Sequence, residues 1–379
     1  MIQSKLPNVG TTIFSVMSKM ATDSGAINLS QGFPGFPVDP TILNLVDKYM
    51  REGFNQYSPM PGMPQLREVI ATKTNVCYDY TPNTETEICV TSGATEALFA
   101  AITALVNKGD EVIIFEPAYD SYIPAIELAG GKPIPIQLKY PNYSIDWDVV
   151  KSKLNSKTKL IITNTPHNPT GAVWKTYDIA ALKEVTHNTD IKIISDEVYE
   201  HIVYNDLRHE SVIFDEELRN KTLVISSFGK TFHATGWKVG YCVAPEYLMT
   251  EFKKVHQFLT FSTSTPMQMA LAEYMKDEKT YLGIPKFYQE KRDYFQELIK
   301  DTNFEILPCS GTYFQLLGYK SISDEPDTIF AEKLCKQNGI ASIPISVFYK
   351  DKLNEKVLRF CFAKEKEELE RAAEKLRRI

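Results

Sequence analysis

The stretch Ile191–Glu200 reads IKIISDEVYE and places a largely apolar run directly before two carboxylates and a tyrosine. Such a run is typical of a strand that helices cover on both faces. Similar runs occur before and after it, separated by stretches with helical periodicity such as Thr95–Leu105 and Ile179–Thr186. We therefore expect strands at Glu87–Thr91, Glu111–Phe115, Lys132–Leu138, Lys159–Thr163, Ile191–Ser195, Thr222–Ser226 and Val239–Ala244. This repeated strand–helix–strand order predicts an α/β fold with a mostly parallel seven-stranded sheet.

The C-terminal part of the chain has a different pattern. Short strands near Tyr313–Leu317 and Lys356–Cys361 lie among long helical stretches, which we expect at Lys286–Ile299, Thr328–Asn338 and Lys364–Arg378. We therefore expect a large domain over residues 46–280 and a smaller α+β domain over residues 281–379. Residues 1–45, which include the Gly- and Pro-rich QGFPGFPVDP, are expected to form an arm that belongs to the small domain.

Composition excludes several classes of function. The chain has 379 residues, and 42 Lys and Arg against 48 Asp and Glu give a net charge of −6, which disfavours a nucleic-acid partner. No apolar run approaches the roughly 18 residues of a membrane span, and the N-terminus does not resemble a signal peptide. The six cysteines form no C-x-x-C pair and the six histidines show no metal spacing. We expect reduced thiols, a cytoplasmic protein and no metal site.

Polar residues follow three of the predicted strands, at the edge of the sheet where ligands of α/β proteins bind. They are TSGATEA (91–97), SDEVYE (195–200) and SSFGKTF (226–232). The first would open a helix and offer its backbone amides to an anion, although it also fits an ordinary turn capped by Thr95. The carboxylates of the second could equally be helix caps.

The third cluster places Lys230 beyond a buried strand, among small polar residues. It is not a P-loop, because Val224 stands where the first glycine belongs, and the S-x-x-K pattern lacks its partner motifs S-D-N and K-T-G. The chain also has no G-x-G-x-x-G or G-x-S-x-G. A lysine at such a place fits covalent amine chemistry, because burial lowers its pKa.

A reactive lysine, an anion site and a strand-end aspartate are together what pyridoxal 5′-phosphate needs. The lysine binds the aldehyde, the amides bind the phosphate and the aspartate keeps the ring nitrogen protonated. Asp196 precedes Lys230 by 34 residues, which leaves room for one helical crossover between neighbouring strands.

With these residues in place, the sequence resembles the class I/II aminotransferases of fold type I along nearly its whole length. The resemblance is closest to the methionine and kynurenine/glutamine aminotransferases. The motifs that carry it, in order, are SQGFPGFP, NQYSPMPGMPQLRE, TSGATEA, EPAYDSY, NTPHNPTG, SDEVYE, SSFGKTF, TGWKVGY and LRFCFA.

The resemblance implies a role for each residue that matches a family motif. Lys230 would bind the cofactor covalently, Asp196 would pair with the ring nitrogen and Tyr199 would contact the ring O3′. The residues that would complete the cofactor site are Gly93, Ala94, Thr95, Tyr119, Asn168, Ser227 and Lys238, with Tyr57 reaching the cofactor of the partner subunit in a homodimer.

Substrate binding follows from the same resemblance. Arg359, Asn168 and the Gly32 backbone would hold the substrate carboxylate, and Phe14 and Tyr313 are candidates for the side-chain pocket together with Tyr57, Phe258 and Phe261. The stretch 256–266 has no arginine where aspartate-specific enzymes carry one, so an apolar, sulfur-containing or aromatic amino acid is expected as donor to a 2-oxo acid, with methionine favoured. The alternatives are a cysteine-S-conjugate β-lyase on the same scaffold, a regulator that binds the cofactor without catalysis, and a metal-independent hydrolase, for which no nucleophile–base pair is found.

Overall fold

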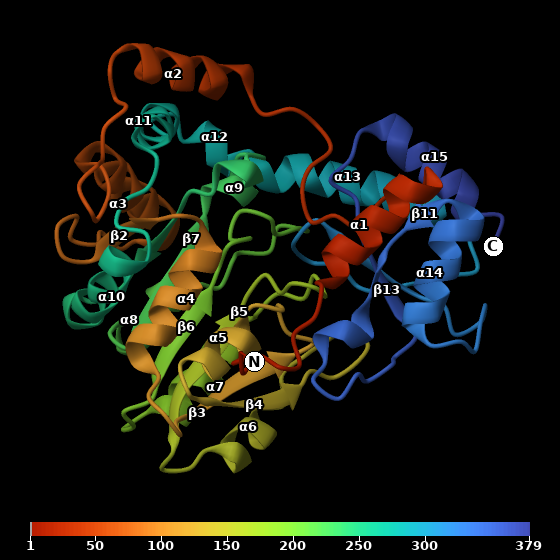
Figure 1. Cartoon of the computed structure of the whole chain (residues 1–379), viewed down its shortest axis with the longest axis horizontal. Helices are drawn as coiled ribbons and strands as arrows, with labels where there is room; N and C mark the ends of the chain where they lie inside the picture. The colour runs from red at the N-terminus through yellow and green to blue at the C-terminus, as the bar shows by residue number, and fades with distance from the viewer. Residues whose placement is uncertain (1) are drawn as a thin grey trace.

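The computed structural model describes residues 2–379 and shows a large body and a smaller one (Figure 1). The large body is built on a seven-stranded sheet in the order β2–β8–β7–β6–β5–β3–β4. Every strand is parallel to the others except β8, which runs antiparallel to both its neighbours, β2 and β7. The strands are β2 (Ile88–Thr91), β3 (Glu111–Glu116), β4 (Lys132–Gln137), β5 (Thr158–Asn164), β6 (Lys192–Asp196), β7 (Thr222–Ser227) and β8 (Gly240–Val243). The predicted mostly parallel sheet is confirmed.

Alternate side chains of the central strands enter different cores, which explains their continuously apolar sequences. In β5, Leu160 and Ile162 pack in a core with helices α4 (Ala94–Leu105), α5 (Tyr122–Leu128) and α10 (Glu246–Leu259). Ile161, between them, points to the opposite face and joins a core that continues into the small body. The sheet is therefore covered on both faces.

The small body contains a four-stranded antiparallel sheet in the order β12–β13–β10–β9. Its strands are β9 (Glu305–Ile306), β10 (Phe314–Gly318), β12 (Ile343–Pro344) and β13 (Val357–Cys361). The flanking helices are α13 (Ile284–Ile299), α14 (Asp327–Asn338) and α15 (Lys366–Leu376). The predicted start of the last helix at Lys364 is wrong, because Phe362 N–H donates to the Tyr313 carbonyl and keeps the chain extended beyond β13.

The N-terminal segment joins the two bodies. Helix α1 (Ile13–Ser24) packs against α14, and β1 (Ile27–Asn28) pairs with β11 (Ile340–Ala341), so the first elements lie among the last ones (Figure 1). Helix α2 (Pro40–Arg51) instead packs against α11 (Thr265–Tyr274) of the large body. The exact domain boundaries stay a proposal.

The remaining helices surround these two sheets. They are α3 (Pro64–Tyr78), α6 (Trp147–Lys153), α7 (Thr176–Thr186), α8 (Glu216–Arg219), α9 (Phe228–Thr231) and α12 (Lys279–Leu282), with short 3₁₀ turns at Val212–Phe214, Thr235–Trp237 and Ile345–Phe348. Among residues 2–379, no helix combines the length and the apolar character needed to cross a bilayer.

Candidate active site

The carboxyl ends of the parallel strands meet at one edge of the large sheet. Asn164 of β5 lies opposite Asp196 of β6, and Gly240 of β8 lies between Thr91 of β2 and Ser227 of β7. A Cβ atom on Gly240 would lie 2.7 Å from the Ser226 carbonyl oxygen and 2.9 Å from the nitrogen of Ala94. Only glycine lets the start of α4 come so close to the sheet.

A cavity of about 170 Å³ opens at this edge. Every residue that the sequence analysis expects to bind the cofactor, except Tyr57, lines this cavity. The lining residues are Gly93, Ala94, Thr95, Leu98, Tyr119, Asn164, Asn168, Asp196, Val198, Tyr199, Ser227, Gly229, Lys230, Thr235, Lys238 and Val239.

One end of the cavity is built for an anion. Helix α4 begins at Ala94, and no side chain caps its first backbone amides. Because Ala94 and Thr95 line the cavity, these amides are available to a ligand there. Gly93 has a φ of 79°, and a Cβ atom there would lie 3.4 Å from Lys238 Nζ. The lysine ammonium therefore lies against the turn, and it adds a full positive charge to the amides.

Asp196 also lines the cavity. It is buried, and Tyr122, on α5, donates a hydrogen bond of 2.6 Å to its Oδ2. Burial raises the pKa of Asp196 to about 6, although the hydrogen bond from Tyr122 and the charge of Lys230 act to lower it. A buried carboxylate whose charge is only partly compensated is suited to a cationic group in the cavity.

The other two acidic residues of SDEVYE have structural partners. Glu197 accepts hydrogen bonds of 2.7 Å from Ser195 Oγ and from His209 Nε2. Glu200 forms a buried ion pair with Lys73 and also accepts from the hydroxyl of Tyr241. Asp196 is thus the acidic residue of this motif that lines the cavity.

Lys230 places its amine between the two bodies of the protein. Its Nζ donates to the carbonyl oxygen of Gly32 and to the hydroxyl of Tyr313, both at 3.1 Å. The Tyr199 ring lies 5.6 Å from the same nitrogen. Burial lowers the pKa of Lys230 to about 8, and the nearby charges of Arg359 and Lys238 act in the same direction. About a tenth of the amine is therefore neutral, and hence nucleophilic, at pH 7, far more than for an ordinary lysine.

Arg359 lies directly behind the wall of the cavity, on β13. Its Nη1 donates to Asn168 Oδ1 at 2.8 Å, and its Nη2 donates to the Ser30 carbonyl at 3.3 Å. The guanidinium stacks 3.9 Å from the ring centre of Phe314, and Phe14 is 5.2 Å away. Within residues 2–379 its buried Nε has no hydrogen-bond partner. A buried guanidinium held in this way is oriented to receive a carboxylate.

Tyr57 is the expected cofactor residue that the structure keeps away from this cavity. It is 84% exposed, and its ring packs edge-on against that of Phe261, with centroids 5.5 Å apart. Phe258 is 87% exposed. Exposed apolar surface of this kind is typical of protein–protein contact sites.

Two hydrogen-bond partners of Asp196 were missed by the sequence reasoning. Tyr122 lies in the quoted motif EPAYDSY, but nothing in the sequence indicates that its hydroxyl reaches Asp196. Asn164 donates to the Asp196 carbonyl at 2.9 Å and accepts from the Asn168 amide at 2.8 Å. Its place at the end of a predicted strand could have identified it.

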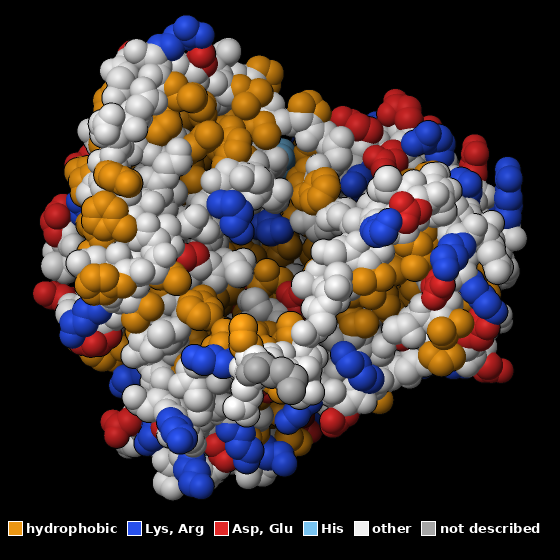
Figure 2. Space-filling model, viewed as in Figure 1, with side chains coloured by type: hydrophobic (Ala, Val, Ile, Leu, Met, Phe, Trp, Pro, Cys, Tyr) orange, Lys and Arg blue, Asp and Glu red, His pale blue; other side chains and the backbone are white. Residues whose placement is uncertain are grey.

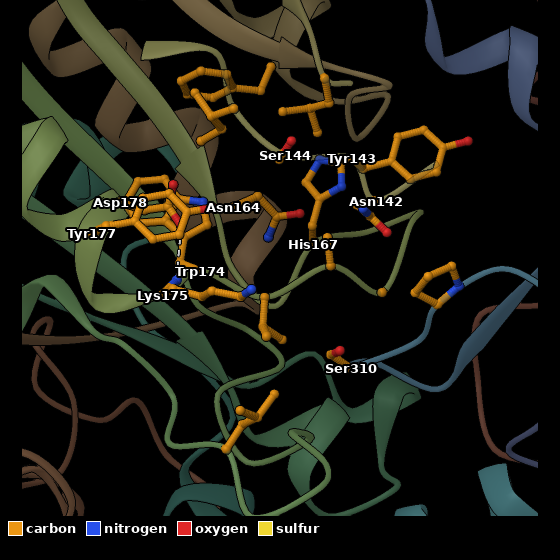
Figure 3. Close-up of a pocket in the computed structure, with 18 residues that line it drawn as sticks. Asn142, Tyr143, Ser144, Asn164, His167, Trp174, Lys175, Tyr177, Asp178 and Ser310 are labelled. Atoms are coloured by element: carbon orange, nitrogen blue, oxygen red, sulfur yellow. Dashed lines mark hydrogen bonds between the residues drawn. The ribbon is translucent and has the colours of Figure 1, made fainter. Parts of the chain in front are cut away.

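A second cavity, of about 420 Å³, lies beside the first and shares Asn164 with it. Figure 3 shows that its wall carries His167, Trp174 and Lys175. Burial lowers the pKa of His167 to about 3, so the ring is neutral. Within residues 2–379 none of the expected site residues lines this larger cavity. The smaller cavity therefore holds the reactive groups.

The chain is similar to several known proteins along nearly its whole length. Residues 24–376 match the model of the family described as aminotransferase class I and II. A methionine aminotransferase from Escherichia coli is 49% identical over 100% of this chain and 98% of its own length. The crystal structure of YbdL from Escherichia coli, reported to identify a methionine aminotransferase function, covers both chains fully with a TM-score of 0.98 and 49% identity. Human kynurenine–oxoglutarate transaminase 1 is 32% identical over 95% of this chain and 94% of its own.

Proposed function

This chain belongs to the class I and II aminotransferases, and we propose that it transfers the amino group of methionine, or of another apolar or aromatic amino acid, to a 2-oxo acid with pyridoxal 5′-phosphate as cofactor. The observation that carries the proposal is the single cavity that joins Lys230, Asp196 and the open start of α4. The transaminase activity itself follows from the family and from its named relatives.

The residues of the cavity fit the three functional groups of the cofactor. The amides of Ala94 and Thr95, with Ser227 and Lys238, would hold the phosphate. The partly compensated carboxylate of Asp196 would pair with the protonated ring nitrogen. The Lys230 amine, with its lowered pKa, would take the aldehyde. When bound, pyridoxal phosphate supplies an electrophilic aldehyde carbon and a ring that accepts electrons from the substrate Cα.

Lys230 is also the group that moves the proton. Its Nζ lies beside the Gly32 carbonyl and the Tyr313 hydroxyl, which would orient the amine while it accepts a proton from the substrate Cα. A pKa of about 8 lets the amine accept the Cα proton and release it again at neutral pH. The Tyr122 hydroxyl favours the ionised form of Asp196 throughout.

Binding of the substrate would begin with its carboxylate. Arg359 presents a planar fork that is held by Asn168 and Ser30 and stacked on Phe314, so little conformational freedom is lost when the carboxylate binds. Phe14 and Phe348 pack against the same guanidinium group. These rings would give the substrate side chain an apolar wall.

The stretch 256–266 offers no free positive charge to a carboxylate on the substrate side chain, and this supports the preference for an apolar side chain. The stretch 256–266 contains no Lys or Arg. Its one histidine, His256, is buried with its Nδ1 2.9 Å from Glu96 Oε1, so its charge is already paired. A second carboxylate on the substrate would therefore be buried without a partner from this stretch, which costs several kcal/mol.

We further propose that the working unit is a cytoplasmic homodimer. The exposed rings of Tyr57, Phe258 and Phe261 support a shared interface, and the six cysteines are all free. In this arrangement Tyr57 would complete the partner subunit's cofactor site.

A spectral scan of the purified holoenzyme against a panel of amino acids tests the function. Methionine and aromatic amino acids should convert the bound cofactor to its aminated form and release the matching 2-oxo acid, and addition of a fresh 2-oxo acid should restore the spectrum. Release of pyruvate and ammonia from a cysteine S-conjugate, without conversion by methionine, would identify a β-lyase instead.

A further inference from the structure

A buried histidine lies beneath the start of α4, outside the cavity itself. His256, on α10, has its Nδ1 2.9 Å from Glu96 Oε1 and its Nε2 3.3 Å from the carbonyl oxygen of Met60. Both partners accept hydrogen bonds and neither donates, so both ring nitrogens must carry a proton. His256 is therefore a buried imidazolium.

Glu96 links this imidazolium to the anion-binding turn. Its second oxygen, Oε2, accepts a hydrogen bond of 3.1 Å from the backbone N–H of Ser92. Ser92 is the residue before Gly93, and Ala94 and Thr95 follow directly. The carboxylate thus satisfies the first amide of the turn Ser92–Thr95 and leaves the amides that face the cavity free for a ligand.

Met60, the other contact of His256, belongs to a segment that is held firmly in place. The Met63 N–H donates to Gln268 Oε1 at 2.7 Å, and the Gln268 Nε2 donates to Ser58 Oγ at 3.0 Å. Gln268 is fully buried. His256 therefore links the turn, through Glu96, to the anchored segment around Met60.

We propose that His256 is a positioning residue for the phosphate group of the ligand, because it holds Glu96, and through it the turn Ser92–Thr95, in the geometry that aims the amides at the cavity. The proposal rests on the function proposed above, which places a phosphate at this turn. His256 touches no ligand and acts only through Glu96.

The hydrogen-bonding neighbours of His256 favour the doubly protonated ring. Burial lowers its pKa, but Cys89 and Glu96 beside it outweigh this effect and raise the pKa to about 10. On its own helix, the ring of Phe252 lies parallel at 6.2 Å, and the Lys253 amine points away to the Glu85 carbonyl. The imidazolium is therefore stable across the physiological pH range.

The chain provides a matched control for this pair. His209 is also buried, and its Nε2 lies 2.7 Å from Glu197 Oε2, at the same edge of the sheet. Glu197 accepts from Ser195, and within residues 2–379 no hydrogen bond joins its side chain to the turn at Gly93. His209 Nδ1 has no hydrogen-bond partner among the described residues, so His209→Gln removes a single buried His–Glu hydrogen bond outside the anion site.

The test compares the apoenzymes of wild type, His256→Gln, Glu96→Gln, the double variant and His209→Gln. Dissociation constants are measured by titration calorimetry for pyridoxal 5′-phosphate, for inorganic phosphate and for pyridoxal, which lacks the phosphate. His256→Gln should bind the two phosphate ligands about tenfold to a hundredfold more weakly, as expected for one lost charge-assisted hydrogen bond, and pyridoxal nearly as well as wild type. The double variant should be no worse than the poorer single variant, because both changes act on one turn.

Three results would overturn the proposal. The first is that His256→Gln binds inorganic phosphate and pyridoxal phosphate within twofold of wild type. The second is that His256→Gln loses as much affinity for pyridoxal as for pyridoxal phosphate. The third is that His209→Gln loses as much affinity for the phosphate ligands as His256→Gln does. A wild-type enzyme that binds no pyridoxal phosphate would refute the proposed function instead, so the two failures are distinct.

Discussion

Replacing Arg359 with lysine should damage recognition of the substrate carboxylate while leaving the cofactor site in place. The guanidinium is fully buried, lies outside the cavity wall and is fixed by Asn168 and Ser30. Lysine keeps the positive charge and fits within the volume of arginine. It offers one compact ammonium where arginine offers a planar fork, so the carboxylate loses one of two parallel hydrogen bonds.

The size of the effect follows from that single bond. A hydrogen bond to a charged group contributes about 1.5–3 kcal/mol, and each 1.4 kcal/mol is a factor of ten, so kcat/KM should fall roughly tenfold to 150-fold. The lysine also leaves either the Asn168 side chain or the Ser30 carbonyl without its donor, which adds to the loss. The loss should be similar for methionine and for an aromatic amino acid, because both present the same carboxylate.

Stopped-flow measurement of the first half-reaction gives kcat/KM directly, and reduction of the bound cofactor with borohydride verifies that it is still present. Arg292→Lys is the control, since Arg292 is also buried and stacks 4.6 Å from the Tyr204 ring, yet it bonds to the Cys309 carbonyl far from the cavity. If Arg359→Lys retained wild-type kcat/KM, or if Arg292→Lys lost as much, Arg359 would not be the carboxylate site.

Two further substitutions and one comparison of substrates test the site. Asp196→Ala should weaken cofactor binding by about tenfold or more and reduce turnover further, because the ring nitrogen loses its countercharge; near-normal turnover would mean that another acid serves this role. Tyr122→Phe should raise the pKa of Asp196 above its value of about 6, since the lost hydrogen bond favours the ionised form, and the acidic limb of the pH profile of cofactor binding should move to higher pH; an unmoved limb contradicts this. Methionine should exceed aspartate in kcat/KM by about two decades, because an unpaired buried carboxylate costs at least ~3 kcal/mol relative to an apolar side chain; equal values would show that the pocket holds a further cation.

The sequence predicted the sheet and the strand-end residues well, for a physical reason. Buried parallel strands need continuously apolar runs, and polar residues that follow such runs must lie at one edge of the sheet. Asp196 and Lys230 are both of this kind, and each lines the cavity. Local sequence is enough to place them.

Contacts between distant segments could not be derived in the same way. The hydrogen bond from Lys230 to Gly32 spans 198 residues, and that from Tyr313 to Gly32 spans 281. Both depend on how the small body packs against the sheet, which no local pattern encodes. The bond from Tyr122 to Asp196 depends likewise on the placement of α5 over the strand ends.

The covalent attachment of the cofactor to Lys230 is the central claim, and one measurement tests it directly. Borohydride reduction of the holoenzyme, followed by proteolysis and mass spectrometry, should place the pyridoxyl group on Lys230 alone. The neutral fraction that a pKa of about 8 provides, and the presence of the amine in the same cavity as Asp196, both predict this result. A label on Lys238, or on a lysine outside the cavity, would contradict the assignment of the active site.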